Sequence, residues 1–214
     1  MSFFYIFYKI LLMMKYFLKG LSIIYLFAFI SFYFQADGLY GDNGIIPIGN
    51  RFESFEADDF KTSELIHRIL RKPNLLLYRK YGGVDDMLDL LCIIGSTASC
   101  AIFWGHSHFV ILFIQFISYL SIYSSGPTFM SFQWDILLLE VGFVSIFLGY
   151  YLPPSHQQRE KRPVIFWLRV IAFKLLFMAG LVKLSSHCPT WNTLTALEYH
   201  FASQCIPTPL GFNI

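Results

Sequence analysis

The feature that most constrains this chain is the stretch from Leu90 to Trp134, which contains no Asp, Glu, Lys or Arg. A helix needs roughly 17–25 apolar residues to cross the hydrocarbon of a bilayer, so this stretch is too long for one span and predicts two. We expect the two helices to be joined at Gly105-His106-Ser107-His108, where small and polar residues interrupt the apolar pattern.

The composition of the whole chain agrees with a membrane environment. The sequence is 56% hydrophobic and 14% charged, whereas soluble domains average about 25% charged residues. Its 24 Phe and 13 Tyr residues are typical of a lipid-facing surface with aromatic side chains at the water boundary. A net charge of +2 without a basic stripe argues against nucleic acid as a partner.

Three further apolar runs extend this prediction to an all-α protein. They are Gly20–Ala36, Ile136–Leu152 and Val164–Leu184. The expected fold is therefore a polytopic transmembrane helix bundle of about five membrane-spanning helices with short lumenal loops. The predicted parts are a cytosolic or interfacial N-terminus (1–19), a first span (20–36), a lumenal loop (37–87), a bundle of four helices (88–184) and a lumenal tail (185–214).

The N-terminal residues 1–19 are apolar but contain Lys9, Lys15 and Lys19, and no small-x-small cleavage site follows them. We interpret them as an amphipathic helix on the membrane surface, followed by an uncleaved signal-anchor. In the loop after the first span, LYGDNGIIP predicts tight turns, and residues 61–72 predict a short amphipathic helix on the lumenal face.

Lys and Arg residues in the short loops predict the orientation, because they favour the cytosolic side. Three Lys residues precede the first span and place the N-terminus in the cytosol. In a five-span topology the loop 153–163, which contains Arg159, Lys161 and Arg162, is also cytosolic. The tail 185–214 has no Lys or Arg and falls in the lumen.

The four cysteines fall into two groups. Cys92 and Cys100 lie in the second span and are expected to pack as small apolar side chains. Cys188 and Cys205 lie in the tail, on the predicted oxidising side of the membrane. We expect a disulfide between them, worth about 3 kcal/mol; the alternative is two separate thiols. Their spacing is not a CxxC redox motif.

Charged residues inside predicted spans are informative, since each costs about 3 kcal/mol at mid-membrane. Asp135 and Glu140 belong to the fourth span, and Arg169, Lys174 and Lys183 to the fifth. Opposite signs on consecutive helices predict the pairs Glu140–Arg169 and Asp135–Lys183. These charges either lock the bundle as ion pairs or line a functional polar pocket, and a small transporter is a further alternative.

Motifs for common catalytic chemistry are absent from the sequence. It has no hydrolase elbow, phosphate-binding loop, dinucleotide fingerprint or zinc-protease helix. His106 and His108 have a spacing that suits a metal, but no Cys, Asp or Glu lies nearby in sequence to complete the ligands. A polar turn explains both histidines, and neither a metal nor a cofactor is expected.

Several segments resemble the lipase maturation factor family, and the resemblance extends from about Tyr25 to Pro209. They are LYGDNGIIP, FQWDILLLEVGF, FWLRVIAFKLLFMAGLVKLSSHCPTW and TALEYHFASQCIPTP. The family consists of multi-pass proteins of the endoplasmic reticulum membrane that help secreted lipases, such as lipoprotein and hepatic lipase, to fold and form active dimers. The resemblance therefore implies a non-enzymatic factor whose partners are membrane lipid and lipase clients. In members of this family, further spans and a large lumenal region follow the position that matches Ile214.

A shorter segment is similar to a motif of a different class of protein. Ala179-Gly180-Leu181-Val182-Lys183-Leu184 resembles the AGxKKL segment of vitamin K-dependent carboxylases, in which the second Lys is the proposed catalytic base. Lys183 matches that residue, and Val182 stands in place of the first Lys. This similarity implies an alternative function as a membrane enzyme with Lys183 as the base, because a desolvated Lys can lose its proton more easily.

Overall fold

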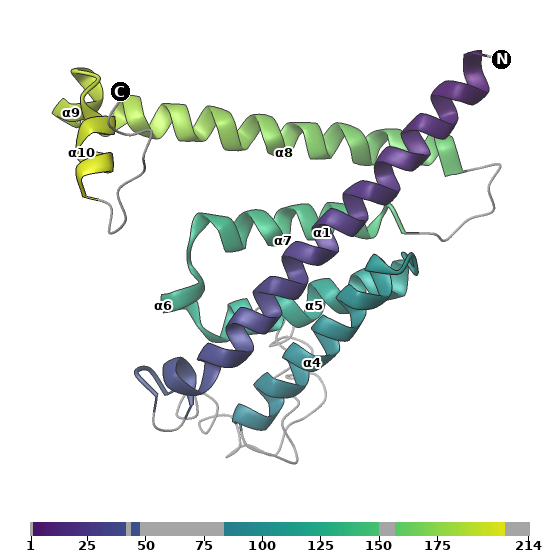
Figure 1. The fold of residues 1–214 in the computed structure, drawn as a ribbon, viewed down its shortest axis with the longest axis horizontal. Helices are drawn as coiled ribbons and strands as arrows, with labels where there is room; N and C mark the ends of the chain where they lie inside the picture. The colour runs from purple at the N-terminus through teal and green to yellow at the C-terminus, as the bar shows by residue number, and fades with distance from the viewer. Residues whose placement is uncertain (1, 42–43, 48–83, 150–156, 204–214) are drawn as a thin grey trace, which may run out of the picture. The chain divides into compact units, whose positions relative to one another are not determined.

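The computed structural model describes residues 2–41, 44–47, 84–149 and 157–203 (Figure 1). Every regular element among these residues is a helix, which confirms the predicted all-α class. The chain divides into two compact units, Met1–Ile165 and Phe166–Ile214. The first unit is called the bundle below.

The helices are α1 (Ser2–Tyr40), α4 (Val84–Phe103), α5 (Phe109–Ser125), α6 (Pro127–Met130), α7 (Gln133–Ile146), α8 (Gln157–Ser185), α9 (Pro189–Asn192) and α10 (Ala196–Ala202). Three of the described helices are long and apolar enough to cross a membrane, over Leu12–Tyr40, Asp85–Phe103 and Pro163–Ser185. The shorter α5 is also apolar.

α1 is longer than the sequence predicted. The expected interfacial helix (1–19) and the expected first span (20–36) form one continuous helix of 39 residues, because no proline lies in this segment to separate them. At 1.5 Å per residue, α1 is about 58 Å long, well beyond the roughly 30 Å of hydrocarbon in a bilayer. One end of α1 must therefore extend past the hydrocarbon unless the helix is strongly tilted.

The described residues 44–47, which follow α1, form part of the turn that the sequence predicted. The Ile45 amide donates to the Gly38 carbonyl at 3.1 Å, and the Ile46 amide donates to the Leu39 carbonyl at 2.9 Å. These bonds fold the chain back onto the last turn of α1. The predicted amphipathic helix at residues 61–72 lies outside the described residues.

The helices break where the sequence predicted a hinge, since α4 ends at Phe103 and α5 begins at Phe109. Gly105 has φ +108°, a conformation that other residues rarely adopt. The Nδ1 atom of His108 accepts a hydrogen bond from the Val110 amide at 3.4 Å and caps the N-terminus of α5. The hinge histidine therefore has a structural role as a helix cap.

α7 is shorter than the predicted fourth span, Ile136–Leu152. It has 14 residues, about 21 Å, and ends in tight turns in which the Gly149 amide donates to the Ile146 carbonyl at 3.0 Å. A Cβ atom at Gly149 would overlap the backbone of Phe109, so the end of α7 lies against the start of α5. Since α5 and α7 are both short, the number of spans stays a prediction.

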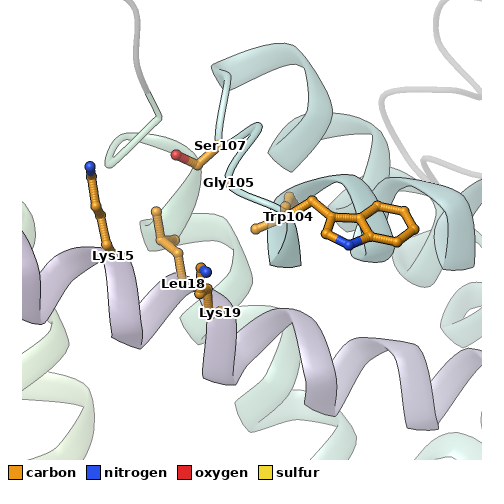
Figure 2. Close-up of a pocket in the computed structure, with 7 residues that line it drawn as sticks. Lys15, Leu18, Lys19, Trp104, Gly105 and Ser107 are labelled. Atoms are coloured by element: carbon orange, nitrogen blue, oxygen red, sulfur yellow. The ribbon is translucent and has the colours of Figure 1, made fainter.

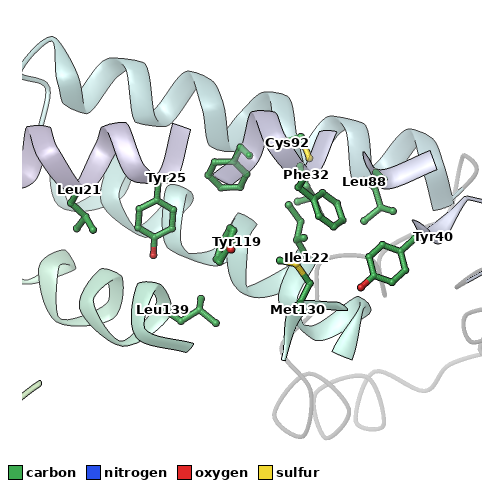
Figure 3. Packing of buried hydrophobic residues seen from close by; sticks show 13 residues of the cluster. Leu21, Tyr25, Phe32, Tyr40, Leu88, Cys92, Tyr119, Ile122, Met130 and Leu139 are labelled. Atoms are coloured by element: carbon green, nitrogen blue, oxygen red, sulfur yellow. The ribbon is translucent and has the colours of Figure 1, made fainter. Parts of the chain in front are cut away.

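Helices α1 and α4 pack against each other and run antiparallel (Figure 1). The core of the bundle consists of side chains from these two helices and from α5, α6 and α7 (Figure 3). Aromatic rings approach glycine backbones there: a Cβ atom at Gly95 would overlap the Phe29 ring, and one at Gly142 would overlap the Tyr25 hydroxyl. Small residues at such contacts let membrane helices come close together. The largest fully buried side chains are Tyr25, Tyr40, Phe29, Leu88, Ile102 and Ile122.

Candidate functional site

One of the predicted intramembrane charges has a polar partner inside the bundle. The Tyr119 hydroxyl donates to Oδ1 of Asp135 at 2.7 Å. The Tyr25 ring meets the Tyr119 ring edge-on at 5.5 Å, and the Tyr25 hydroxyl donates to the Leu138 carbonyl at 2.9 Å. Sequence reasoning missed both tyrosines, although a buried Tyr in an apolar run requires an acceptor for its hydroxyl.

The two predicted ion pairs join residues of different units and stay predictions. Glu140 lies in α7 of the bundle, whereas Arg169 lies in α8. The proposed partner of Asp135, Lys183, lies in the last turn of α8. The structure therefore gives Asp135 a tyrosine partner that the sequence did not predict.

Within the second unit, Lys183 contacts an aromatic ring that follows it in the chain. Its Nζ atom lies 4.5 Å from the centre of the Trp191 ring. The chain turns back between them at His187, which has φ +51°, a left-handed conformation that is uncommon for residues other than glycine. The ring face attracts the ammonium group, so this contact holds α9 near the end of α8.

Cys188 is positioned as the N-cap residue of α9. Its Sγ atom lies 3.0 Å from the Thr190 Oγ1 atom. Hydrogen bonds from the Thr190 hydroxyl, and then from the amides of Thr190 and Trp191, lower the pKa of the Cys188 thiol because they stabilise the thiolate. A thiol with a lowered pKa forms disulfides more readily near neutral pH.

Cys188 is a free thiol in the structure, and its predicted partner Cys205 lies outside the described residues. The disulfide therefore stays a prediction. Cys92 and Cys100 are also free; Cys92 is buried in the core cluster, as predicted for a small apolar side chain, and Cys100 is half-buried.

The segment after α8 exposes a group of apolar side chains, which we call the tail surface: Trp191, Leu194, Leu197 and Tyr199. Leu194 is 86% exposed and Tyr199 is 65% exposed. Leu194 also has φ +62°, so an uncommon backbone conformation presents this side chain to solvent. Exposed apolar side chains that form a patch are typical of a surface that contacts another protein or the bilayer.

The two hinge histidines do not form part of a larger ligand set in the described part of the chain. Among residues 2–41, 44–47, 84–149 and 157–203, no three His, Cys, Asp or Glu side chains lie close enough together to hold a metal ion.

Long apolar helices, a bundle with a polar interior contact and a short helical tail define this chain as a multi-pass helical membrane protein. Residues 12–214 match the lipase maturation factor transmembrane domain. The chain belongs to the lipase maturation factor family.

Individual relatives agree with this assignment. The chain is 40% identical over 208 residues to lipase maturation factor 2 of Xenopus laevis. The matched region covers 92% of this chain and 28% of that protein. It is 34% identical over 211 residues to human lipase maturation factor 2, covering 92% of this chain and 29% of that protein. Human lipase maturation factor 1 is 28% identical over 205 residues, covering 92% of this chain and 35% of that protein. The chain thus spans about a third or less of the length of these relatives. No solved structure matches it.

Proposed function

We propose that this chain is the membrane-embedded part of a factor of the endoplasmic reticulum that helps secreted lipases fold and assemble into active dimers. The family match over residues 12–214 carries this proposal. Lipoprotein lipase and hepatic lipase are the expected type of client. Because such a factor assists folding, no catalytic residue is assigned.

The tail surface supports a role in contacting clients. Partly folded lipases expose apolar surface before they dimerise, and such surface aggregates unless it is shielded. Leu194 and Leu197 present apolar side chains on a segment held to α8 by the Lys183–Trp191 contact. In the predicted orientation this segment lies in the lumen, where secreted lipases fold.

The experiment is a rescue assay in cells that lack their own lipase maturation factors. Expressing the full chain should raise the specific activity of secreted lipase, whereas lipase synthesis should stay constant. Leu194→Gln together with Leu197→Gln should reduce the rescue, and the control Asn192→Gln, on the same segment, should preserve it. Equal specific activity with and without the chain, at normal expression, would contradict the proposal.

The proposed lumenal position of the tail has its own test. A glycan-acceptor sequence placed after Pro209 should be glycosylated in cells, because only the lumenal side contains the transferase. An unmodified acceptor in a folded, membrane-inserted protein would place the tail in the cytosol and remove its access to secreted lipases.

The carboxylase alternative gains no support from the structure or from the relatives. A general base must be a neutral amine, whereas the Lys183 ammonium lies over the Trp191 ring in an arrangement that suits a cation. Maturation of lipases therefore remains the function that we propose.

A further inference from the structure

A cavity at one end of the bundle has a lining that differs from the core. It has a volume of about 240 Å³ and lies between the N-terminal half of α1 and the hinge that joins α4 to α5 (Figure 2). Its lining residues are Lys15, Leu18, Lys19, Ile102, Trp104, Gly105 and Ser107. The side chains of these residues include two ammonium groups and a hydroxyl, and no carboxylate.

The lysines reach this cavity from one helix and the polar groups from another segment. Lys15 and Lys19 are four residues apart on α1, so both lie on the same face of the helix. Figure 2 shows Lys15, Leu18 and Lys19 on α1 facing the hinge residues Gly105 and Ser107. The Nζ atom of Lys19 also lies 5.5 Å from the centre of the Phe103 ring, which holds its charge near the end of α4.

The cavity is located at the boundary of two candidate spans. Leu12–Tyr40 begins beside it and Asp85–Phe103 ends beside it. Trp104 follows immediately and is 76% exposed, as is typical of an indole at the level of the lipid headgroups. Lys side chains at such a boundary place their apolar stems in lipid and their ammonium groups in the headgroup layer.

We propose that this cavity binds the phosphate group of an anionic phospholipid headgroup. Two ammonium groups supply the charge that a phosphate requires, and the Ser107 hydroxyl can donate a hydrogen bond to it. The volume lies somewhat below the roughly 300–1,000 Å³ of pockets for drug-sized ligands and suits a small headgroup. The predicted orientation places this end in the cytosolic leaflet, where anionic lipids concentrate.

The test uses the full chain in nanodiscs that contain phosphatidylcholine with a minor fraction of phosphatidic acid, followed by native mass spectrometry of the lipids that stay bound. The chain should retain phosphatidic acid selectively. Lys15→Gln together with Lys19→Gln should reduce this retention roughly 30-fold, because each Lys near an anionic headgroup contributes about a fivefold factor. Lys15→Arg with Lys19→Arg should preserve most of it, and Lys174→Gln, which does not line the cavity, should leave it unchanged.

A second arm distinguishes a lipid from a soluble phosphate ester. If the site takes a lipid, glycerol 3-phosphate and inorganic phosphate should not displace phosphatidic acid. Displacement by glycerol 3-phosphate, with no preference among lipids, would overturn the lipid assignment in favour of a soluble ester. Equal retention by the chain and the double Gln variant, both folded by circular dichroism, would overturn the site altogether.

Discussion

The bundle helices and α8 are similarly apolar, but very different shares of their residues are buried within the unit to which each helix belongs. The most apolar windows of α1 and α4 have mean hydropathy 1.8 and 1.6 and are 33% and 39% buried, whereas that of α8 has mean hydropathy 2.0 and is 6% buried. Hydropathy therefore predicts that a helix enters a membrane, but not how much of it is buried within its own unit.

Side-chain size explains the packing of the bundle. Gly95 and Gly142 receive the rings of Phe29 and Tyr25 from α1, and these contacts bring the helices close together. On α8, a Cβ atom at Gly180 would meet nothing within 4 Å. The following predictions test this difference, from the largest expected effect on the free energy of unfolding to the smallest.

Gly95→Leu should destabilise the bundle by about 3 kcal/mol or more, because the new side chain would overlap the Phe29 ring and force the helices apart. The measurement is unfolding in mixed detergent, followed by circular dichroism. Gly180→Leu is the matched control on α8 and should not lower the midpoint of the unfolding transition. A similar loss from both variants would show that α8 is packed as tightly as the bundle.

Tyr119→Phe should lower the free energy of unfolding by about 1–2 kcal/mol, because it removes the hydrogen bond to Asp135 within the apolar bundle. The same detergent titration measures it. Tyr199→Phe removes a hydroxyl from a side chain that is 65% exposed and should have no measurable effect. If the free energy of unfolding did not change in Tyr119→Phe, the hydrogen bond to Asp135 would not stabilise the bundle.

Lys183→Gln should loosen the tail without affecting the bundle. The contact with Trp191 is worth about 0.5–1 kcal/mol, so hydrogen exchange at the amides of residues 191–193 should accelerate roughly two- to fivefold. Lys183→Arg retains the cation and serves as the control. Unchanged exchange in the Gln variant would mean that this contact does not hold α9 in place.

Thr190→Val should leave stability unchanged but alter the reactivity of Cys188. The Thr190 hydroxyl helps lower the pKa of the thiol, so its loss should raise that pKa, and alkylation at a given pH should slow. The rate is measured against pH in a Cys205→Ser background. Thr193→Val is the control, because the Thr193 hydroxyl donates to the Pro189 carbonyl at 2.9 Å and not to Cys188. A pH profile equal to that of the parent would remove the proposed role of Thr190.

The parts that the sequence predicted well are those governed by local composition. Charge-free runs predicted the helices, and the small and polar residues at 105–108 predicted the hinge between α4 and α5. Contacts between distant segments were not predictable in this way. Nothing in the sequence indicates that Phe29 meets Gly95 or that Tyr119 meets Asp135, because these contacts depend on which faces the helices present to one another.

Helix ends also depend on more than composition. The sequence predicted a boundary near Gly20, but α1 continues through it because one glycine costs only about 1 kcal/mol in a helix. It also predicted a span through Leu152, whereas α7 ends at Ile146, where the chain turns against Phe109. The Lys183–Trp191 contact was missed because it requires the left-handed turn at His187.

The close approach of Tyr25 to α7 restricts which residues this chain tolerates at two positions. The Tyr25 hydroxyl reaches the Leu138 carbonyl only because Gly142 leaves the space beside it empty. A methyl group at position 142 would be compatible with the fold only if position 25 lost its hydroxyl or its ring. The two positions are thermodynamically coupled, and substitutions that persist at one of them should be accompanied by compensating substitutions at the other.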